Sequence, residues 1–145
     1  MTEILQRILS LDYGTVRIGI AISDPLRLIA TALETYQNND NFIDRLLALI
    51  RAHEIGMIVV GMPLNLKGQE ERKAQEVRIF IDRLRSAVDI PIRTWDERFT
   101  STMAKKSMLE IGIGKKKRQD KSRVDQIAAA LLLQGFLDAR AYDRE

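Results

Sequence analysis

Three acidic residues that are far apart in the chain have the chemistry of a hydrolytic site: Asp12, Glu97 and Asp125. Asp12 ends an apolar segment, where a carboxylate without a partner would be costly to bury. If the fold brings the three together, their charges repel one another unless a cation neutralises them. Ligand sets made only of oxygen select hard cations such as Mg²⁺ or Mn²⁺. A pair of these ions can activate water and stabilise the leaving oxygen of a phosphodiester, so the acids predict a metal-dependent hydrolytic site.

Each acid also has a purely structural interpretation. Asp12 can start a turn by accepting a hydrogen bond from its own backbone. Glu97 can form a surface ion pair with the arginine that follows it. Asp96 is an alternative ligand, because a shift of one residue reverses the direction of a side chain on a strand. Asp125 follows Ser122 at the spacing of a capping box and can simply cap a helix.

Basic residues gather close to these acids in the sequence. Arg17 and Arg98 each lie near a proposed ligand, and we expect them to neutralise phosphate charge. A denser basic cluster lies in the segment just before Asp125, and only one residue of opposite charge, an aspartate, lies within it. Its members are Lys115, Lys116, Lys117, Arg118, Lys121 and Arg123. Such a cluster is typical of a phosphate-binding surface, with a solvated loop and surface ion pairs as the structural alternatives.

Composition excludes several kinds of site. The chain of 145 residues fits one domain, and its 46% hydrophobic content is typical of a globular protein. It has no cysteine, which excludes disulfides and thiolate metal sites, and the single His53 excludes a histidine-rich zinc site. The first residues lack the apolar core of a secretory signal, and no segment is long enough to span a bilayer. We therefore expect a cytoplasmic protein that does not bind membranes.

The elements that must position the acids begin with two short strands in the apolar segment 8–23, joined by a tight turn at Gly14. Hydrophobic periodicity predicts further strands at 32–36, 57–61 and 91–95, and helices at 42–54, 70–87, 100–111 and 123–142. Short connections make the first three strands antiparallel, whereas the later ones need crossover helices and should be parallel. The prediction is an α/β protein with a mixed five-stranded sheet and helices on both faces.

Four motifs with suitable gaps carry a resemblance to a known family. They are Leu11-Asp12-Tyr13-Gly14-Thr15 with Arg17-Ile18-Gly19, Val59-Val60-Gly61-Met62-Pro63-Leu64-Asn65, Asp96-Glu97-Arg98-Phe99-Thr100-Ser101, and Val124-Asp125-Gln126-Ile127-Ala128-Ala129. Together they resemble the YqgF family of Holliday-junction-resolvase-like nucleases, also described as pre-16S ribosomal RNA nucleases. The resemblance implies one RNase H-like domain over residues 1–145. It also implies that Asp12, Glu97 and Asp125 are metal-binding catalytic acids, and that Gly61, Pro63 and Asn65 form a loop near them.

The function expected from residues and resemblance is a nuclease that uses Mg²⁺ or Mn²⁺ to cut structured nucleic acid. Processing of the 5′ end of pre-16S rRNA is the leading substrate, and the oligomeric state is open between monomer and homodimer. Two alternatives are a Holliday junction resolvase and a ribosome-assembly factor that binds nucleic acid without cutting it. The opening Asp-x-Gly-Thr motif is also similar to the first phosphate loop of actin-like and sugar-kinase ATPases. Those enzymes need two such domains, and this chain has one.

Overall fold

The structure is a computed structural model that describes residues 6–65, 67–97 and 121–143. Its sheet contains five strands, which are β1 (Arg7–Asp12), β2 (Arg17–Ser23), β3 (Ala30–Gln37), β4 (Ile55–Met62) and β5 (Ile92–Asp96). The described helices are α1 (Phe42–Ala52), α2 (Arg72–Ala87) and α4 (Lys121–Asp143). The helix predicted over 100–111 and the lysines at 115–117 lie outside the described residues.

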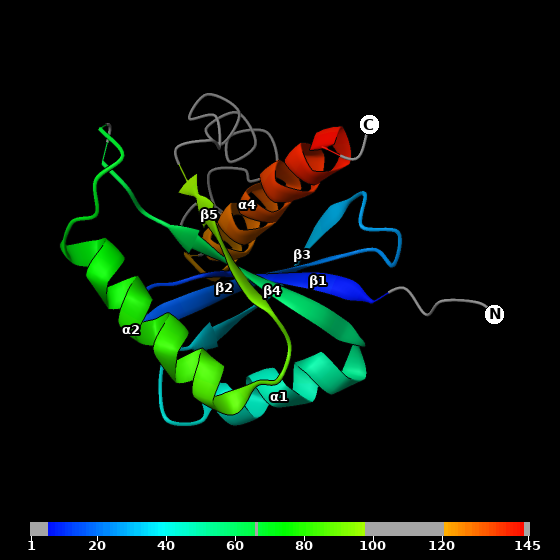
Figure 1. Cartoon of the computed structure of the whole chain (residues 1–145). Coiled ribbons are helices and arrows are strands. Elements are labelled where there is room, and N and C mark those ends of the chain that lie inside the picture. Colours follow the sequence, from blue (N-terminus) through cyan, green and yellow to red (C-terminus); the bar gives the residue numbers. More distant parts are fainter. Residues whose placement is uncertain (1–5, 66, 98–120, 144–145) are drawn as a thin grey trace.

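The strand order across the sheet is β3-β2-β1-β4-β5 (Figure 1). Strand β2 pairs antiparallel with both β1 and β3, and β4 pairs parallel with both β1 and β5. The mixed five-stranded sheet is therefore confirmed, with the antiparallel and parallel parts where connection lengths predicted them. Because β1 and β4 are parallel neighbours, their carboxyl ends lie at the same edge of the sheet, where β5 also ends.

Helices cover both faces of the sheet, as Figure 1 shows. Alternate residues of a strand point to opposite faces, and β1 shows the division clearly. Leu9 and Leu11 belong to the core beneath α1 and α2, whereas Ile8 packs with residues of α4 on the other face. Ser10 also faces α4, since its hydroxyl donates a 2.8 Å hydrogen bond to the carbonyl oxygen of Ala129.

The face toward α1 and α2 holds the larger core. Branched side chains of the three central strands meet aromatic and aliphatic side chains of the two helices. Phe42 is fully buried and lies 5.8 Å, centroid to centroid, from Phe80. Within the described residues, no helix combines the length and apolar content needed to cross a membrane.

Several element boundaries differ by one or two residues from the sequence prediction. Helix α2 begins at Arg72 rather than at 70, because Glu70 pairs with Leu64 in an isolated bridge and its carboxylate binds Arg78. Strand β4 begins at Ile55 rather than at 57, since Glu54 makes the turn after α1 with a φ of 54°. Helix α4 already includes Lys121, two residues earlier than predicted.

Candidate active site

Asp12 lies at the carboxyl end of β1, on the face of the sheet that α4 covers. The alternation that turns Ile8 and Ser10 toward α4 places Asp12 on the same side. In the antiparallel ladder Asp12 is opposite Gly19 of β2. In the parallel ladder Leu11 is opposite Val60, so the next residue of β4 beside Asp12 is Gly61. Asp12 is thus flanked by a glycine on each neighbouring strand.

Gly19 allows α4 to lie directly on the backbone of β2. A Cβ on Gly19 would lie 2.1 Å from the carbonyl oxygen of Asp125 and 3.1 Å from its Cβ, so any side chain there would push the helix away. Two hydrogen bonds hold the helix in this position. The Ser10 hydroxyl donates to Ala129, and the Thr35 hydroxyl donates to the carbonyl oxygen of Ser122. The close approach therefore brings Asp125 to the edge of the sheet at which Asp12 lies.

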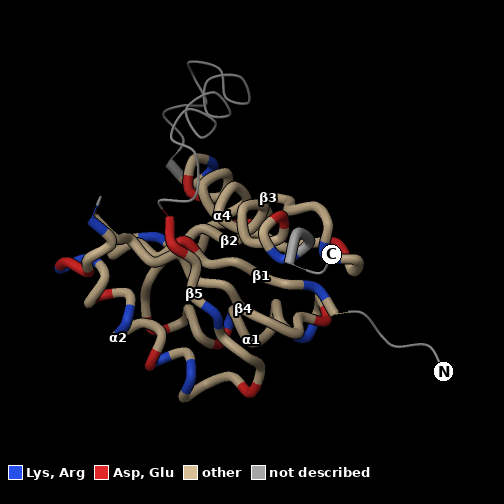
Figure 2. The backbone as a smooth tube through the Cα atoms, turned by 45° about the horizontal axis from the view of Figure 1, so that its top comes forward, with Lys and Arg blue, Asp and Glu red and all other residues tan. Residues whose placement is uncertain are grey.

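Gly61 makes room for the third acid in the same way. A Cβ on Gly61 would lie 2.5 Å from Oε1 of Glu97, so the glutamate carboxylate packs over the bare backbone of β4. Glu97 follows β5, whose last residue, Asp96, pairs with Met62. Figure 2 shows this acidic end of β5 beside the start of α4. Among the described residues, Glu97 lines the pocket between these elements and Asp96 does not.

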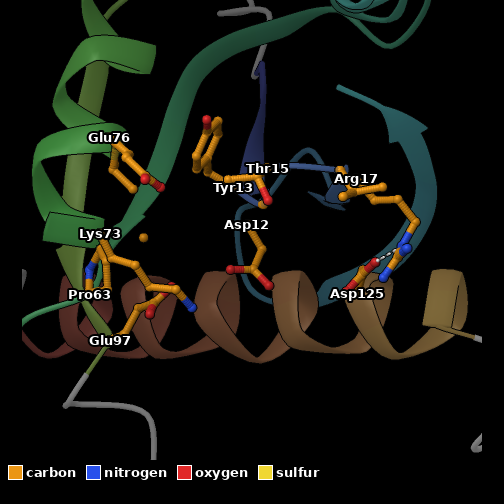
Figure 3. Close-up of a pocket in the computed structure, with 13 residues that line it drawn as sticks. Asp12, Tyr13, Thr15, Arg17, Pro63, Lys73, Glu76, Glu97 and Asp125 are labelled. Atoms are coloured by element: carbon orange, nitrogen blue, oxygen red, sulfur yellow. Dashed lines mark hydrogen bonds and ion pairs between the residues drawn. The ribbon is translucent and has the colours of Figure 1, made fainter. Parts of the chain in front are cut away.

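A pocket of about 510 Å³ joins the three predicted acids. Asp12 lies between Glu97 on one side and Asp125 on the other (Figure 3). The described residues that line the pocket are Asp12, Tyr13, Gly14, Thr15, Val16, Arg17, Gly61, Pro63, Lys73, Glu76, Val77, Glu97 and Asp125. The pocket thus opens at the edge of the sheet between α4 and the start of α2.

An ion pair fixes Asp125 within this pocket. Nε of Arg17 lies 2.8 Å from Oδ2 of Asp125, and the two side chains are 27% and 26% exposed. Figure 3 shows the Asp125 carboxylate turned toward Arg17, on the far side of Asp12 from Glu97. The capping-box interpretation of Asp125 is wrong, because it needs Ser122 just before the helix and Ser122 lies inside α4. Contact of Arg17 with nucleic acid stays a prediction.

Two charged pocket residues were not found from the sequence. Lys73 and Glu76 come from the first turns of α2 and are three residues apart, so they lie on one side of the helix. The signal available in the sequence was position: α2 follows the loop that leaves the carboxyl end of β4. Tyr13 completes this wall, with its ring 4.7 Å from that of Phe80.

Most of the other residues predicted to bind nucleic acid lie outside the described part of the chain. Arg123 is exposed on α4 and is not among the described pocket residues. Lys121 is the first residue of α4, and its side chain lies outside the description. Arg98, Lys115, Lys116, Lys117 and Arg118 all lie outside the described residues. Their roles stay predictions.

The charges of the pocket favour a hard cation. Among the described residues, four carboxylates and two cationic side chains line it, which gives these residues a formal charge of −2. All its acidic donors are oxygens, as Mg²⁺ and Mn²⁺ require. In the present side-chain arrangement, no three acidic or histidine residues of the described part converge closely enough to hold a metal ion. The oxygen donors of the pocket fit a divalent cation, whereas the Asp125 carboxylate is turned toward Arg17.

Sequence comparison gives the family. A family model described as "RuvX: Holliday junction resolvase" matches residues 6–139. Curated relatives carry the name "Putative pre-16S rRNA nuclease". One from a Sulfurihydrogenibium species is 38% identical over 143 residues, covering 97% of this chain and 96% of its own. One from Koribacter versatilis is 42% identical over 141 residues, covering 96% and 91%.

Comparison with solved structures gives the fold. The Thermus thermophilus RuvC resolvase in complex with a Holliday junction substrate superposes with a TM-score of 0.62 at 14% identity, covering 94% of this chain and 96% of its own. The fowlpox virus resolvase in complex with Holliday junction DNA gives 0.59 at 14% identity, covering 93% and 99%. The fold is therefore the RuvC-type, RNase H-like fold, and the chain belongs to the RuvX family, also called YqgF.

Proposed function

We propose that this protein is a divalent-metal-dependent endonuclease that cuts structured nucleic acid, with the 5′ end of pre-16S rRNA as its substrate. The observation that carries the proposal is the convergence of Asp12, Glu97 and Asp125 on one pocket with excess negative charge. These acids come from a strand end, a loop and a helix that are far apart in the chain. The described lining, with a formal charge of −2, repels an anionic phosphodiester, so substrate binding there requires added positive charge.

Asp12, Glu97 and Asp125 are the residues that would hold the cation. When bound, a divalent ion supplies Lewis-acid polarisation of the phosphoryl oxygen and lowers the pKa of water. The protein itself supplies the position of the carboxylates. Gly19 and Gly61 determine how closely Asp125 and Glu97 approach Asp12, and this fixes where the charge can be neutralised.

Lys73 is the other positively charged residue in the described lining of the pocket. It forms no ion pair with any of the described acidic residues, whereas Arg17 is paired. In the proposed function the Lys73 ammonium donates to a phosphate oxygen of the substrate from the α2 side of the pocket. The basic residues Arg98, Lys115 to Arg118, Lys121 and Arg123 would extend phosphate contacts along the strand on either side of the cut.

The names of the curated relatives support pre-16S rRNA as the substrate. The family model and the solved resolvases give a specific reason to test branched DNA as a second candidate. Resolution of a four-way junction cuts two opposed strands, so that activity would favour a homodimer, whereas trimming of an rRNA end needs one site.

The test is cleavage of a pre-16S rRNA fragment and of a synthetic four-way junction, with Mg²⁺, with Mn²⁺ and with EDTA. Wild type is compared with Asp12→Asn and with Asp44→Asn, a matched removal of one carboxylate at an exposed position of α1. We expect metal-dependent cutting that falls at least ~100-fold in the Asp12 variant and is unchanged in the Asp44 variant.

The cleaved substrate decides between RNA and junction. If wild type binds both nucleic acids and cuts neither, and Asp12→Asn binds more tightly because a repelling charge is gone, the nuclease proposal is wrong. The protein is then a binding factor in ribosome assembly.

A further inference from the structure

Two cationic side chains of the described part of the chain line the pocket, and they differ in their partners. Figure 3 shows Lys73 near Glu97 at one side and Arg17 joined to Asp125 at the other, with Asp12 between them. Arg17 donates from Nε to Oδ2 of Asp125 at 2.8 Å. The carboxylate of Asp125, one of the three predicted metal ligands, thus already binds a cationic side chain of the protein.

We propose that Arg17 competes with the divalent cation for Asp125 and so sets how tightly the pocket binds metal. The inference rests on the proposed function, because it assumes that Asp125 is a metal ligand. The Arg17 guanidinium and a divalent cation are both positively charged, so they compete for the oxygens of the same carboxylate. The fixed positive charge also repels an incoming divalent ion over the short distances of the pocket.

Holding α4 in place does not depend on this ion pair. Gly19 lets the helix pack on β2, and hydrogen bonds from Ser10 and Thr35 fix two of its backbone carbonyls. The carboxyl group of Asp125 is also about one-quarter exposed, so exposure weakens the pair as a stabilising contact. We therefore expect the pair to influence the chemistry of the pocket more than the stability of the fold.

The competition connects metal binding to substrate binding. Without a cation, Arg17 neutralises one of four clustered carboxylates and reduces their mutual repulsion. When Asp125 turns to the cation, the Arg17 guanidinium is released at the wall of the pocket, where a substrate phosphate can accept its hydrogen bonds. By linkage, a phosphate that engages Arg17 then strengthens metal binding by the same factor by which metal strengthens phosphate binding.

The test is a Mn²⁺ binding isotherm, measured from the electron paramagnetic resonance of free Mn²⁺, without nucleic acid. Wild type is compared with Arg17→Gln, Arg17→Lys and the charge-matched control Arg93→Gln, which is exposed on β5 and does not line the pocket. We expect Arg17→Gln to lower the Kd about three- to tenfold, the size expected for losing one partly exposed competing charge pair. Arg17→Lys should fall between it and wild type, and Arg93→Gln should match wild type.

A second readout follows the arginine itself. In wild type, addition of diamagnetic Mg²⁺ should shift the ¹⁵N–¹H resonance of the Arg17 Nε and raise its exchange with water, as the bond to Asp125 is lost. This measurement needs no variant, so it stands even if Arg17→Gln folds poorly.

The outcomes separate the two proposals. If Asp12→Asn abolishes Mn²⁺ binding but Arg17→Gln leaves the Kd unchanged or weakens binding, the Arg17 inference is wrong and the metal site stands. An Arg17 Nε resonance that does not respond to saturating Mg²⁺ overturns the inference as well. If wild type binds no Mn²⁺, both the inference and the metal-dependent function are wrong.

Discussion

The two faces of this sheet are built from residues of different size, and the difference separates stability from chemistry. Toward α1 and α2 the central strands present Leu11, Ile20 and Val60, which are fully buried in the larger core. At neighbouring positions toward α4 the same strands present Asp12, Gly19 and Gly61. Large side chains keep α1 and α2 at a distance set by packing, whereas missing side chains let α4 and Glu97 touch the sheet backbone. One face therefore supports the fold, and the other creates a space lined by acids.

The comparison predicts that removal of side-chain volume lowers stability most on the face toward α1 and α2. Phe42→Ala should lower the free energy of unfolding by about 3–5 kcal/mol, because the buried ring contacts both Tyr36 and Phe80. Chemical denaturation followed by circular dichroism measures this. Ile79→Ala is the control, since Ile79 is 71% exposed on α2 and should change stability by less than about 0.5 kcal/mol. Equal losses in the two variants would contradict the assignment of the main core.

On the face toward α4, by contrast, addition of side-chain volume should lower both stability and metal binding. Gly19→Ala places a methyl group against the backbone of Asp125, which has no flexible end that can move aside. We expect a loss of about 1–3 kcal/mol and of most Mn²⁺ affinity, because α4 must shift. Gly56→Ala is a control for a steric clash outside the pocket, since its new methyl group would lie 2.6 Å from Cβ of Gln6 and should leave Mn²⁺ affinity unchanged. If Gly19→Ala melts like wild type and binds metal normally, the close approach of α4 does not position the site.

The core on the face toward α1 and α2 should also lose stability at alkaline pH, through Tyr36. Burial, followed by the nearby Glu34, raises the pKa of Tyr36 to about 12, while the cation of Arg45 over its ring acts in the opposite direction. Folding therefore favours the protonated phenol. This contribution is complete below pH 10 and is lost as the pH rises toward 12, by about 1–2 kcal/mol. Urea denaturation at several pH values tests it, and Tyr36→Phe should lose less stability over that range. Parallel pH profiles of the two proteins would be the contrary result.

The smallest effect on stability, with a large effect on function, is expected at Gly61. Its added methyl group would meet the carboxylate end of Glu97, which can rotate away. Gly61→Ala should change the free energy of unfolding by less than about 1 kcal/mol. Single-turnover cleavage should fall at least about tenfold, because Glu97 no longer lies over β4. A large loss of stability with normal cleavage per folded molecule would reverse the roles assigned to the two faces.

The sequence predicted the fold well because strand periodicity, connection lengths and turn residues are local or nearly local signals. It also named three of the four described acids that line the pocket, although Asp96 remained an alternative to Glu97 and Glu76 was missed. The choice between them depends on how β5 ends beside Gly61, which is a tertiary contact. Helix α2 was placed too early, because Glu70 looked like a first-turn acid but binds Arg78 instead.

The details of the pocket were less accessible. Nothing local in the sequence indicates that Arg17 reaches Asp125, because the two are 108 residues apart and meet only when α4 lies on β2. Lys73 and Glu76 read as ordinary surface residues of a helix, and only its packing beside the end of β1 brings them into the pocket.

The most direct test of the central claim, that the α4 face carries one metal site, is paramagnetic broadening by Mn²⁺. Substoichiometric Mn²⁺ is added to ¹⁵N-labelled protein, and loss of each amide signal is recorded. We expect the amides of Gly14, Gly19, Gly61, Glu97 and Asp125 to broaden first, and Asp12→Asn to abolish the effect. Signals of α1, on the opposite face, should persist. Broadening centred elsewhere, or an unchanged pattern in Asp12→Asn, would contradict a metal site at this pocket.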